Sequence, residues 1–306
     1  MKTVRALAMA ALLASIHPHS ASLIQAADTQ TSSWHTAIAR TLGREGSLQP
    51  GDVYKVGFPR TDLKVTLGNL RVEPGLALGS WAAFKRVGAG DEAMVMGDLV
   101  LLTAEVNPVM TRLLENGLDV TALHNHLLGE TPRLLYLHYE GRGGAAALAE
   151  KLKGALSATA TPLKASPSGP PPALTAVEAK AFQRVQEILG HEGKVAGKVL
   201  QVAVPRPEKI ECNGVEIPPA MGTATALNFE PTGDGVAATG DFVLLDDEVI
   251  SVLHALRAGG IDVTAIHSHM LHDTPSLKFV HFWGEGPAEK IAGALRGALD
   301  KIDADK

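Results

Sequence analysis

The chain has 306 residues, about twice the usual domain length of ~150 residues, so we expect two domains and exclude a disulfide-stapled mini-protein. Apolar residues make up 45% and charged residues 20% of the chain, which argues against a disordered protein or a membrane bundle. The net charge of -5, with no long basic run, argues against nucleic acid and anionic membrane surfaces as partners.

The N-terminus has the pattern of an export signal. Lys2 and Arg5 precede an apolar run over residues 6–16, which is followed by small residues. The run is too short to span a bilayer, and no later stretch reaches the ~18 apolar residues of a transmembrane helix. We expect residues 1–27 to be a signal peptide, cleaved between Ser22 and Ala27. The mature protein would then be periplasmic or secreted and would have no transmembrane segment. A buried N-terminal helix is the alternative.

The rest of the chain contains one unit twice. Residues 97–141 align without gaps with residues 240–284, and 22 of these 45 positions are identical. The match extends upstream to Pro-Arg at 59–60 against Pro-Arg at 205–206, and both copies close with a predicted helix. Residues 157–173 are rich in Pro, Ser and Ala, which is typical of a semi-rigid linker. We therefore predict repeats at 28–156 and 174–306, joined by a linker at 157–173.

The elements of the first copy are predicted in chain order. A helix over residues 34–42 ends at a Gly, and alternating segments then predict antiparallel strands at 52–56, 64–72, 78–87 and 93–103. One apolar face predicts a helix over 105–116. A hairpin follows, with strands at 120–128 and 134–139, and a closing helix spans 145–156. The second copy begins with a helix over 176–189. The predicted fold class is α+β, a tandem duplication of an antiparallel-sheet unit with helices.

Histidines concentrate in the two predicted hairpins. Seven of the 12 histidines lie there, namely His124, His126, His138, His267, His269, His272 and His281. Residues two apart on a strand point to the same face, which joins His124 with His126. A five-residue loop over 129–133 places His124 opposite His138, so that three imidazoles share one face. The second copy offers the same triad in His267, His269 and His281.

Three convergent neutral imidazoles that leave one coordination position open are typical of a divalent-metal site, with Zn²⁺ as the first candidate. Such a metal acidifies a bound water, which predicts metal-assisted hydrolysis, while metal binding alone serves transport or sensing. Glu130 and Asp273 stand four positions after the second His of each copy. Each is a candidate catalytic general base, a fourth ligand or an acceptor that orients an imidazole.

Two other interpretations of the hairpins stay open. In the first, the imidazoles satisfy backbone groups, and Glu130 or Asp273 shapes the turn with the Thr-Pro that follows it. In the second, His-x-His with an acid four residues later resembles the first metal motif of cupins and implies a cupin-like barrel. The long predicted helix before the strand departs from that family. His272 is either a surface residue or a substitute ligand in the second copy.

A few polar residues outside the hairpins have weaker functional interpretations. Arg60 and Arg206, each after a Pro at a strand end, are candidates to bind an anionic group, with a surface position as the alternative. Asp98 and Asp241, each in a Gly-Asp pair, are expected in turns. Cys212 has no second Cys for a disulfide and no nearby His in the sequence, which argues against a nucleophile.

Several motifs occur together in a specific order. They are Gly-Asp-x-Val-Leu-Leu, a helix, Asp-Val-Thr-Ala-[Leu/Ile]-His-x-His, [Glu/Asp]-Thr-Pro, a strand ending in His, and Tyr-Lys-Val-Gly-Phe-Pro-Arg at 54–60. In this arrangement the chain resembles the LppY/LpqO family of bacterial exported proteins over nearly all of its mature length. The resemblance implies export and a duplicated domain of unknown function, and it supplies no activity. Members are named as lipoproteins, whereas this chain has no Cys near its signal.

We therefore hypothesise an exported tandem-repeat protein whose histidine hairpins bind a divalent metal. The alternative is a non-enzymatic module that binds a cell-envelope component or another ligand. Whether the two repeats share one site is open at this point.

Overall fold

The computed structural model describes residues 34–88, 90–164, 173–233 and 235–302. The predicted signal peptide, residues 1–27, and residues 165–172 of the predicted linker lie outside the described residues. Residues 34–42 form the first helix, as predicted. The first copy continues through β1 Ser47–Gln49, β2 Val53–Pro59, β3 Thr66–Leu67, β4 Leu70–Arg71, α2 Pro74–Ala77, β5 Gly79–Arg86, β6 Glu92–Leu102, α3 Thr103–Glu115, β7 Asp119–His124, β8 Leu134–Gly144 and α4 Ala145–Leu156.

The second copy repeats this order of elements, with a 3-10 helix in place of α2 and one additional strand, β16. It consists of α5 Ala176–Leu189, β9 Gly193–Ala196, β10 Val199–Pro205, β11 Glu211–Cys212, β12 Val215–Glu216, the 3-10 helix η1 Pro219–Met221, β13 Ala224–Thr232, β14 Gly235–Leu244, α6 Val249–Ala258, β15 Asp262–His267, β16 Asp273–Thr274, β17 Lys278–Gly286 and α7 Ala288–Leu299.

Each copy builds a six-stranded antiparallel sheet with the same topology. The strand order is β1-β2-β5-β6-β8-β7 in the first copy and β9-β10-β13-β14-β17-β15 in the second. The fold is therefore α+β and duplicated, as the sequence predicted. The alternative of a cupin-like barrel is wrong, because the strands form two open sheets.

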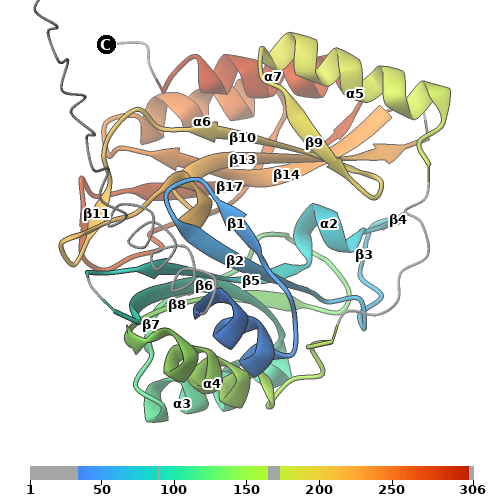
Figure 1. The fold of residues 1–306 in the computed structure, drawn as a ribbon. Coiled ribbons are helices and arrows are strands. Elements are labelled where there is room, and N and C mark those ends of the chain that lie inside the picture. The colour runs from blue at the N-terminus through green and yellow to red at the C-terminus, as the bar shows by residue number, and fades with distance from the viewer. Residues whose placement is uncertain (1–33, 89, 165–172, 234, 303–306) are drawn as a thin grey trace, which may run out of the picture.

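The two sheets lie face to face between two layers of helices. Figure 1 shows α3 and α4 outside the first sheet and α5, α6 and α7 outside the second. One apolar core fills the space between each sheet and its own helices. A third core, which we call the inter-sheet core, joins buried side chains of both copies, among them Met96, Cys212, Val243 and Phe279. Because both faces of β6 are covered, every residue from Ala93 to Leu101 is buried.

Each copy also reaches over the sheet of the other. The short helix α2 packs against β13 and β14, and η1 lies against β2. Lys55 Nζ donates to the Ala220 carbonyl at 3.0 Å, and Gln201 Nε2 donates to the Gly75 carbonyl at 3.1 Å. Lys55 stands five residues before Arg60, and Gln201 stands five residues before the equivalent Arg206. The two contacts are therefore equivalent, and they tie the copies together in both directions.

One predicted strand is a hairpin instead. The segment 64–72 contains β3 and β4, which pair through Leu67 and Leu70. Gly68 between them has a φ of 57°, in the left-handed region that glycine adopts without steric cost. A tight turn at this glycine reverses the chain where the alternation of residues alone predicts one continuous strand.

Arg60 and Arg206 are buried structural residues rather than anion sites. The Arg60 guanidinium donates to the Val100 carbonyl at 2.7 Å and pairs with Asp62 and Glu105. Arg206 makes the equivalent contacts with the Val243 carbonyl, Glu208 and Glu248. Carboxylates of the same copy therefore occupy both guanidinium groups, which corrects both sequence interpretations of them.

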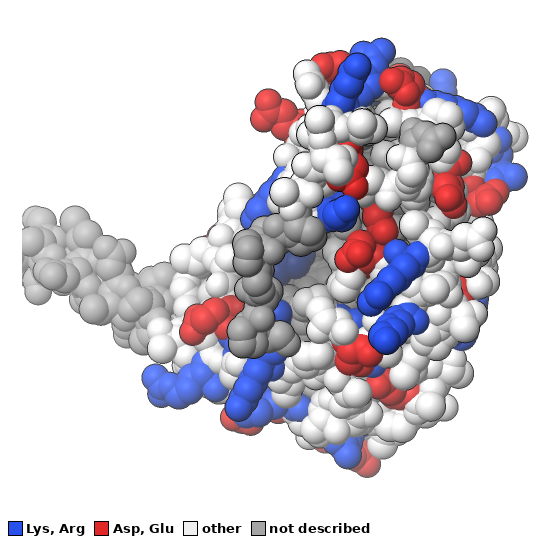
Figure 2. Space-filling view, turned by 90° about the vertical axis from the view of Figure 1, so that its right-hand side faces the viewer, with Lys and Arg blue, Asp and Glu red and all other residues white. Residues whose placement is uncertain are grey.

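The described surface offers no strong electrostatic feature on the face drawn in Figure 2. Basic and acidic side chains lie interspersed there, and neither sign forms a continuous patch. This distribution fits the nearly balanced 28 basic and 33 acidic residues. None of the helices in the described part of the chain is long and apolar enough to cross a membrane.

We predict that Arg60→Ala lowers the free energy of unfolding by about 3 kcal/mol or more, because it leaves the Glu105 carboxylate without its buried partner. Urea denaturation followed by circular dichroism measures this loss. The matched control is Arg71→Ala, which removes an exposed guanidinium and should cost less than about 0.5 kcal/mol. Equal losses in the two variants would contradict the structural role of Arg60.

Candidate metal centre

Six histidines from the two copies meet in one place. We call these residues the imidazole cluster: His124, His126, His138, His267, His269 and His281. Three pairs of rings stack across the boundary between the copies. The ring centroids of His124 and His267 lie 3.5 Å apart, and the pairs His126–His281 and His138–His269 are each separated by 3.8 Å. His126 is equivalent to His269, and His138 to His281, so the last two pairs are exchanged by the duplication. The cluster therefore has approximate twofold symmetry, and the two predicted triads form one cluster.

The ends of β7 and β15 bring the rings together. Each of these edge strands ends at the first histidine of its motif, His124 or His267. Asn125 Nδ2 donates to the Thr264 carbonyl at 2.9 Å, and Thr264 Oγ1 donates to the His126 carbonyl at 2.7 Å. These two hydrogen bonds fasten the loop of the first copy to the strand of the second.

The predicted register of the hairpin is wrong, although its histidines do converge. The strand ends at His124 rather than at residue 128, so His126 and His269 lie in loops. A bulge between Val120 and Ala122 shifts the pairing, and His138 faces Ala122 while His124 faces Tyr136. The loop between the strands spans residues 125–133 and is longer than the five residues predicted, so that His124 pairs two residues away from His138; alternation in the sequence reveals neither the bulge nor this loop. The loop, and not a shared strand face, places His126.

Four of the histidines are buried, His126 and His267 are half-buried, and most of the rings have a buried nitrogen without a partner. Within the described residues, the Nε2 atoms of His138, His267, His269 and His281 and the Nδ1 of His124 make no hydrogen bond. Buried polar atoms in proteins are nearly always hydrogen-bonded, so five unpartnered atoms in one cluster indicate a binding site.

Two of the rings are oriented by main-chain carbonyls. His281 Nδ1 lies 3.0 Å from the Gly240 carbonyl oxygen, and His267 Nδ1 lies 3.1 Å from that of Ser268. A neutral imidazole that donates from Nδ1 to a carbonyl carries a free electron pair on Nε2. This arrangement is typical of metal-binding histidines, whose second nitrogen is held by a hydrogen bond.

The spacing of the nitrogens fits coordination to an ion. The ring nitrogens form two groups, and within each group all of the nitrogens lie within 4.8 Å of one another. The groups are His124, His126 and His138, and His124, His267, His269 and His281. Two nitrogens bound at 2.0–2.1 Å to one tetrahedral ion are about 3.3–3.4 Å apart. The Nε2 atoms of His124 and His126 are 3.1 Å apart, close to that value. His124 belongs to both groups and is therefore the centre of the cluster.

Burial keeps the cluster in the neutral form that binds metals. It lowers the pKa of every ring in the cluster, and neighbouring imidazoles lower the pKa of most of them further. The pKa of His267 falls to about 4 and that of His281 to about 3. A metal ion at neutral pH therefore meets unprotonated nitrogens and displaces few protons.

Asp98 adjoins the cluster, and sequence reasoning missed its role. Its Oδ2 lies 3.8 Å from His126 Nε2, and its Oδ1 lies 3.9 Å from His138 Nε2. The residue sits inside β6, so the expectation of a turn was wrong. Burial, together with the nearby Asp241, raises the pKa of Asp98 well above its usual range. The recurrence of Gly-Asp in both copies was the available signal for a role of this residue.

A half-buried lysine lies near Asp98 and Asp241. Lys55 Nζ is 4.1 Å from the centroid of the Trp81 ring, a cation–π contact. Burial lowers the pKa of Lys55 to about 8, an effect that Asp241 and Asp98 oppose. Burial also raises the pKa of Asp241 to about 7. One amine with a lowered pKa and two carboxyl groups with raised pKa therefore lie next to the imidazole cluster.

Glu130 and Asp273, the predicted catalytic carboxylates, lie outside both nitrogen groups. Glu130 Oε1 accepts a hydrogen bond from the Leu134 amide at 2.9 Å, and Asp273 Oδ2 accepts one from the Leu277 amide at 2.6 Å. Both carboxylates thus close the loop of their hairpin, as the structural interpretation proposed. Their catalytic role stays a prediction. His272 is exposed and belongs to neither group.

Comparison with known proteins places both copies in one family. A protein-family model described as Domain of Unknown Function (DUF1259) matches residues 36–158 and again residues 183–301. The chain belongs to this family. Each DUF1259 match covers nearly all of one sheet and its helices, and each contributes three histidines to the cluster. No curated protein matches the chain.

Two solved structures show weak similarity to this DUF1259 protein. EtuB from Clostridium kluyveri is 10% identical, with 84% of this chain and 91% of that chain covered and a TM-score of 0.21. A trimeric bacterial microcompartment shell protein, PduB, is 13% identical, with coverage of 84% and 93% and a TM-score of 0.20. TM-scores this low support no conclusion about fold or function.

We predict that the imidazole cluster makes the metal-free protein sensitive to acid. The rings of His267 and His281 stay neutral in the folded state, whereas the unfolded chain protonates near pH 6.5. The unfolded state therefore binds more protons below pH 6.5, and stability falls as the pH is lowered towards 4. Each such imidazole contributes up to about 1.4 kcal/mol per pH unit.

Urea unfolding in the presence of EDTA, at several pH values from 7 to 4, measures this slope. The carboxyl groups with raised pKa act in the opposite direction, so the wild type is compared with His267→Gln/His281→Gln. The variant should lose less stability per pH unit. Parallel pH profiles would show that these rings are not held neutral.

Proposed function

We propose that this protein binds transition-metal ions, with divalent zinc as the first candidate, at one centre to which both copies contribute imidazoles. The observation that carries the proposal is the set of buried ring nitrogens, from both copies, that lack any partner in the described residues. Their mutual distances and neutral state suit coordination.

Packing alone is a poor explanation for the cluster. A buried polar atom without a partner costs about 1–3 kcal/mol, and five such nitrogens stand together here. Apolar side chains in these positions would avoid that cost. A bound ion supplies a partner for the nitrogens of the group that coordinates it, which offsets part of this cost.

The donor set favours particular metals. Imidazole suits Zn, Cu, Fe and Ni, whereas Mg²⁺ and Ca²⁺ prefer oxygen ligands. The two nitrogen groups share His124, so the cluster offers one group of three and one group of four donors that compete for the same ring. The expected stoichiometry is therefore one ion per chain, or two ions if His124 contributes one nitrogen to each.

The support is stronger for binding a metal than for hydrolysis. The cavity lined by His138 and His269 has a volume of about 10 Å³, which matches a water molecule rather than an organic substrate. Glu130 and Asp273 are engaged in the turns. We therefore propose metal binding, for transport, storage or sensing, as the function of the centre.

The alternative, a module that binds a cell-envelope component, has less support. A larger cleft of about 270 Å³ is lined by Lys85, Arg206 and Lys209, among others. Arg206 is paired with Glu208 and Glu248, and Lys209 with Glu211. Arg206 and Lys209 are therefore neutralised within the chain, and Lys85, whose Nζ donates to the Gly51 carbonyl, leaves the cleft little charge for an anionic polymer.

We also propose that the protein works outside the cytoplasm. The support is the charged and apolar pattern of residues 1–27 and the resemblance to the LppY/LpqO family. Fusion of residues 1–33 to a reporter that is active only after export would test this proposal.

We predict that untagged protein, incubated with Zn²⁺ and desalted, retains at least one ion per chain by elemental analysis. Binding to the folded state must raise the melting temperature. His124→Ala, which removes the ring common to both groups, should lower the retained metal and abolish most of that rise.

The matched control is His254→Ala, which removes an exposed histidine on α6 and should bind like the wild type. Protein that retains no zinc, copper, nickel or iron and melts at the same temperature with each of them would refute the proposed function.

A further inference from the structure

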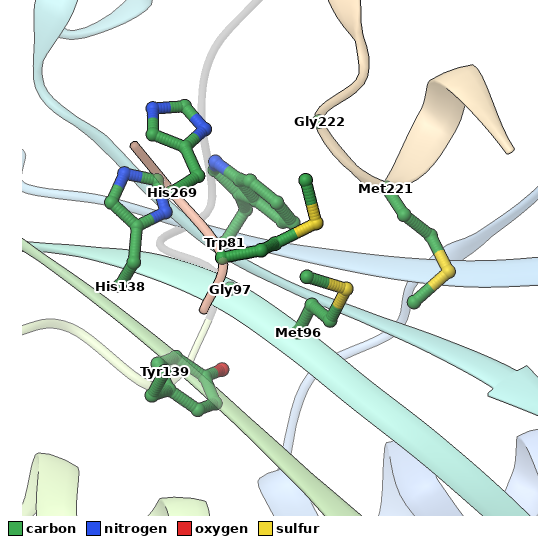
Figure 3. Close-up of a pocket in the computed structure, with 9 residues that line it drawn as sticks. Trp81, Met96, Gly97, His138, Tyr139, Met221, Gly222 and His269 are labelled. Atoms are coloured by element: carbon green, nitrogen blue, oxygen red, sulfur yellow. The ribbon is translucent and has the colours of Figure 1, made fainter. Parts of the chain in front are cut away.

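One side of the imidazole cluster opens into a small cavity rich in sulfur. The cavity is lined by His138, His269, Trp81, Met96, Met221 and Met270, together with Gly97, Tyr139 and Gly222 (Figure 3). Its volume of about 10 Å³ is close to that of a single small particle such as a water molecule or an ion. We call it the methionine cavity.

The three methionines come from three separate segments. Met96 lies on β6, Met221 ends η1 and Met270 follows β15, so both copies contribute thioethers. All three side chains are buried, at 6%, 2% and 3% exposure. The chain has seven methionines, of which five lie in the described residues, and three of those five line this one cavity.

The two histidines of the cavity present unused nitrogens. His138 and His269 are only 5% and 7% exposed, and the Nε2 atom of each lacks a hydrogen-bond partner in the described chain. Their rings lie 3.8 Å apart. The cavity therefore brings two imidazoles and three thioethers together, with no charged side chain in its lining.

The duplication provides an internal comparison. On the opposite side of the approximate twofold axis, His281 and His126 replace His138 and His269 at an offset of 143 residues. Thr239 stands there in place of Met96, and Leu127 in place of Met270. The fold is the same on both sides. Backbone geometry thus does not require methionine at these positions, and these two sulfur atoms are a property of one side only.

The ligand chemistry of the two sides differs accordingly. Thioether sulfur is a soft, polarisable donor that selects Cu(I) over hard divalent cations. Imidazole also accepts copper, so a mixed set of neutral nitrogen and sulfur donors favours a singly charged soft ion. The low charge of Cu(I) also reduces the cost of burial in an apolar cavity.

We propose that the methionine cavity is a Cu(I) site, in which His138, His269 and the thioethers of Met96, Met221 and Met270 supply the ligands. The inference rests on the proposed metal-binding function and names a second metal and its side of the cluster. The opposite side lacks sulfur, and each nitrogen group proposed for the divalent ion includes His138 or His269, so the two metals share these rings.

The test compares Cu(I) binding by the full-length protein and by two double variants. Met96→Leu/Met270→Leu removes two thioethers with little change in volume, and Met94→Leu/Met110→Leu is the matched control because neither residue lines the cavity. Cu(I) affinity is measured anaerobically by competition with bicinchoninate, and Zn²⁺ affinity by competition with a zinc indicator. We expect the cavity variant to bind Cu(I) at least about tenfold more weakly, with unchanged Zn²⁺ affinity.

A second measurement separates coordination from packing. X-ray absorption at the copper edge should show sulfur neighbours in the wild type and the control and a reduced sulfur contribution in the cavity variant. Unchanged Cu(I) affinity, equal losses for Cu(I) and Zn²⁺, or a copper spectrum without sulfur would each overturn the copper site without refuting zinc binding by the wild type. Failure of the wild type to bind any metal would instead refute the proposed function.

Discussion

Each sheet of this protein buries both of its faces, one under its own helices and the other against the sheet of the other copy. This second burial is the constraint on which the rest depends. It creates the inter-sheet core, in which residues of both copies pack together. It also brings the ends of β7 and β15 together, so that their histidines are in contact. A single copy would expose both its apolar inner face and its half of the imidazole cluster.

The interface is unusual in the polar groups that it contains. Lys55, Asp98 and Asp241 lie close to the histidines. Burial lowers the pKa of Lys55 and raises the pKa of both aspartates, which favours the neutral form of each group. The copies are held together around these groups by reciprocal hydrogen bonds from Lys55 and Gln201. Such an arrangement sacrifices stability that an apolar interface would provide, and the ion that we propose at the imidazoles would compensate for it.

The two copies have diverged at the place where they meet. Their sheets, buried arginines and histidines remain equivalent, so the architecture is preserved in each. The residues around the histidine pairs are not equivalent, since Met96 and Met270 correspond to Thr239 and Leu127. Duplication therefore produced one centre with two chemically different sides. The side with thioethers is suited to a soft ion, and the other side offers nitrogen donors alone.

The sequence by itself determined the duplication, the class of fold, most helices and strands, and the concentration of histidines in two hairpins. These features follow from local periodicity and from comparison of the chain with itself. It did not determine the bulge at Val120 to Ala122, the positions of His126 and His269 in loops, or the burial of Asp98 beside them. Only the tertiary structure decided that two triads form one cluster and that three distant methionines adjoin it. The physical reason is that alternation in a strand specifies which residues are buried, whereas the partner of each buried face depends on how the two sheets pack.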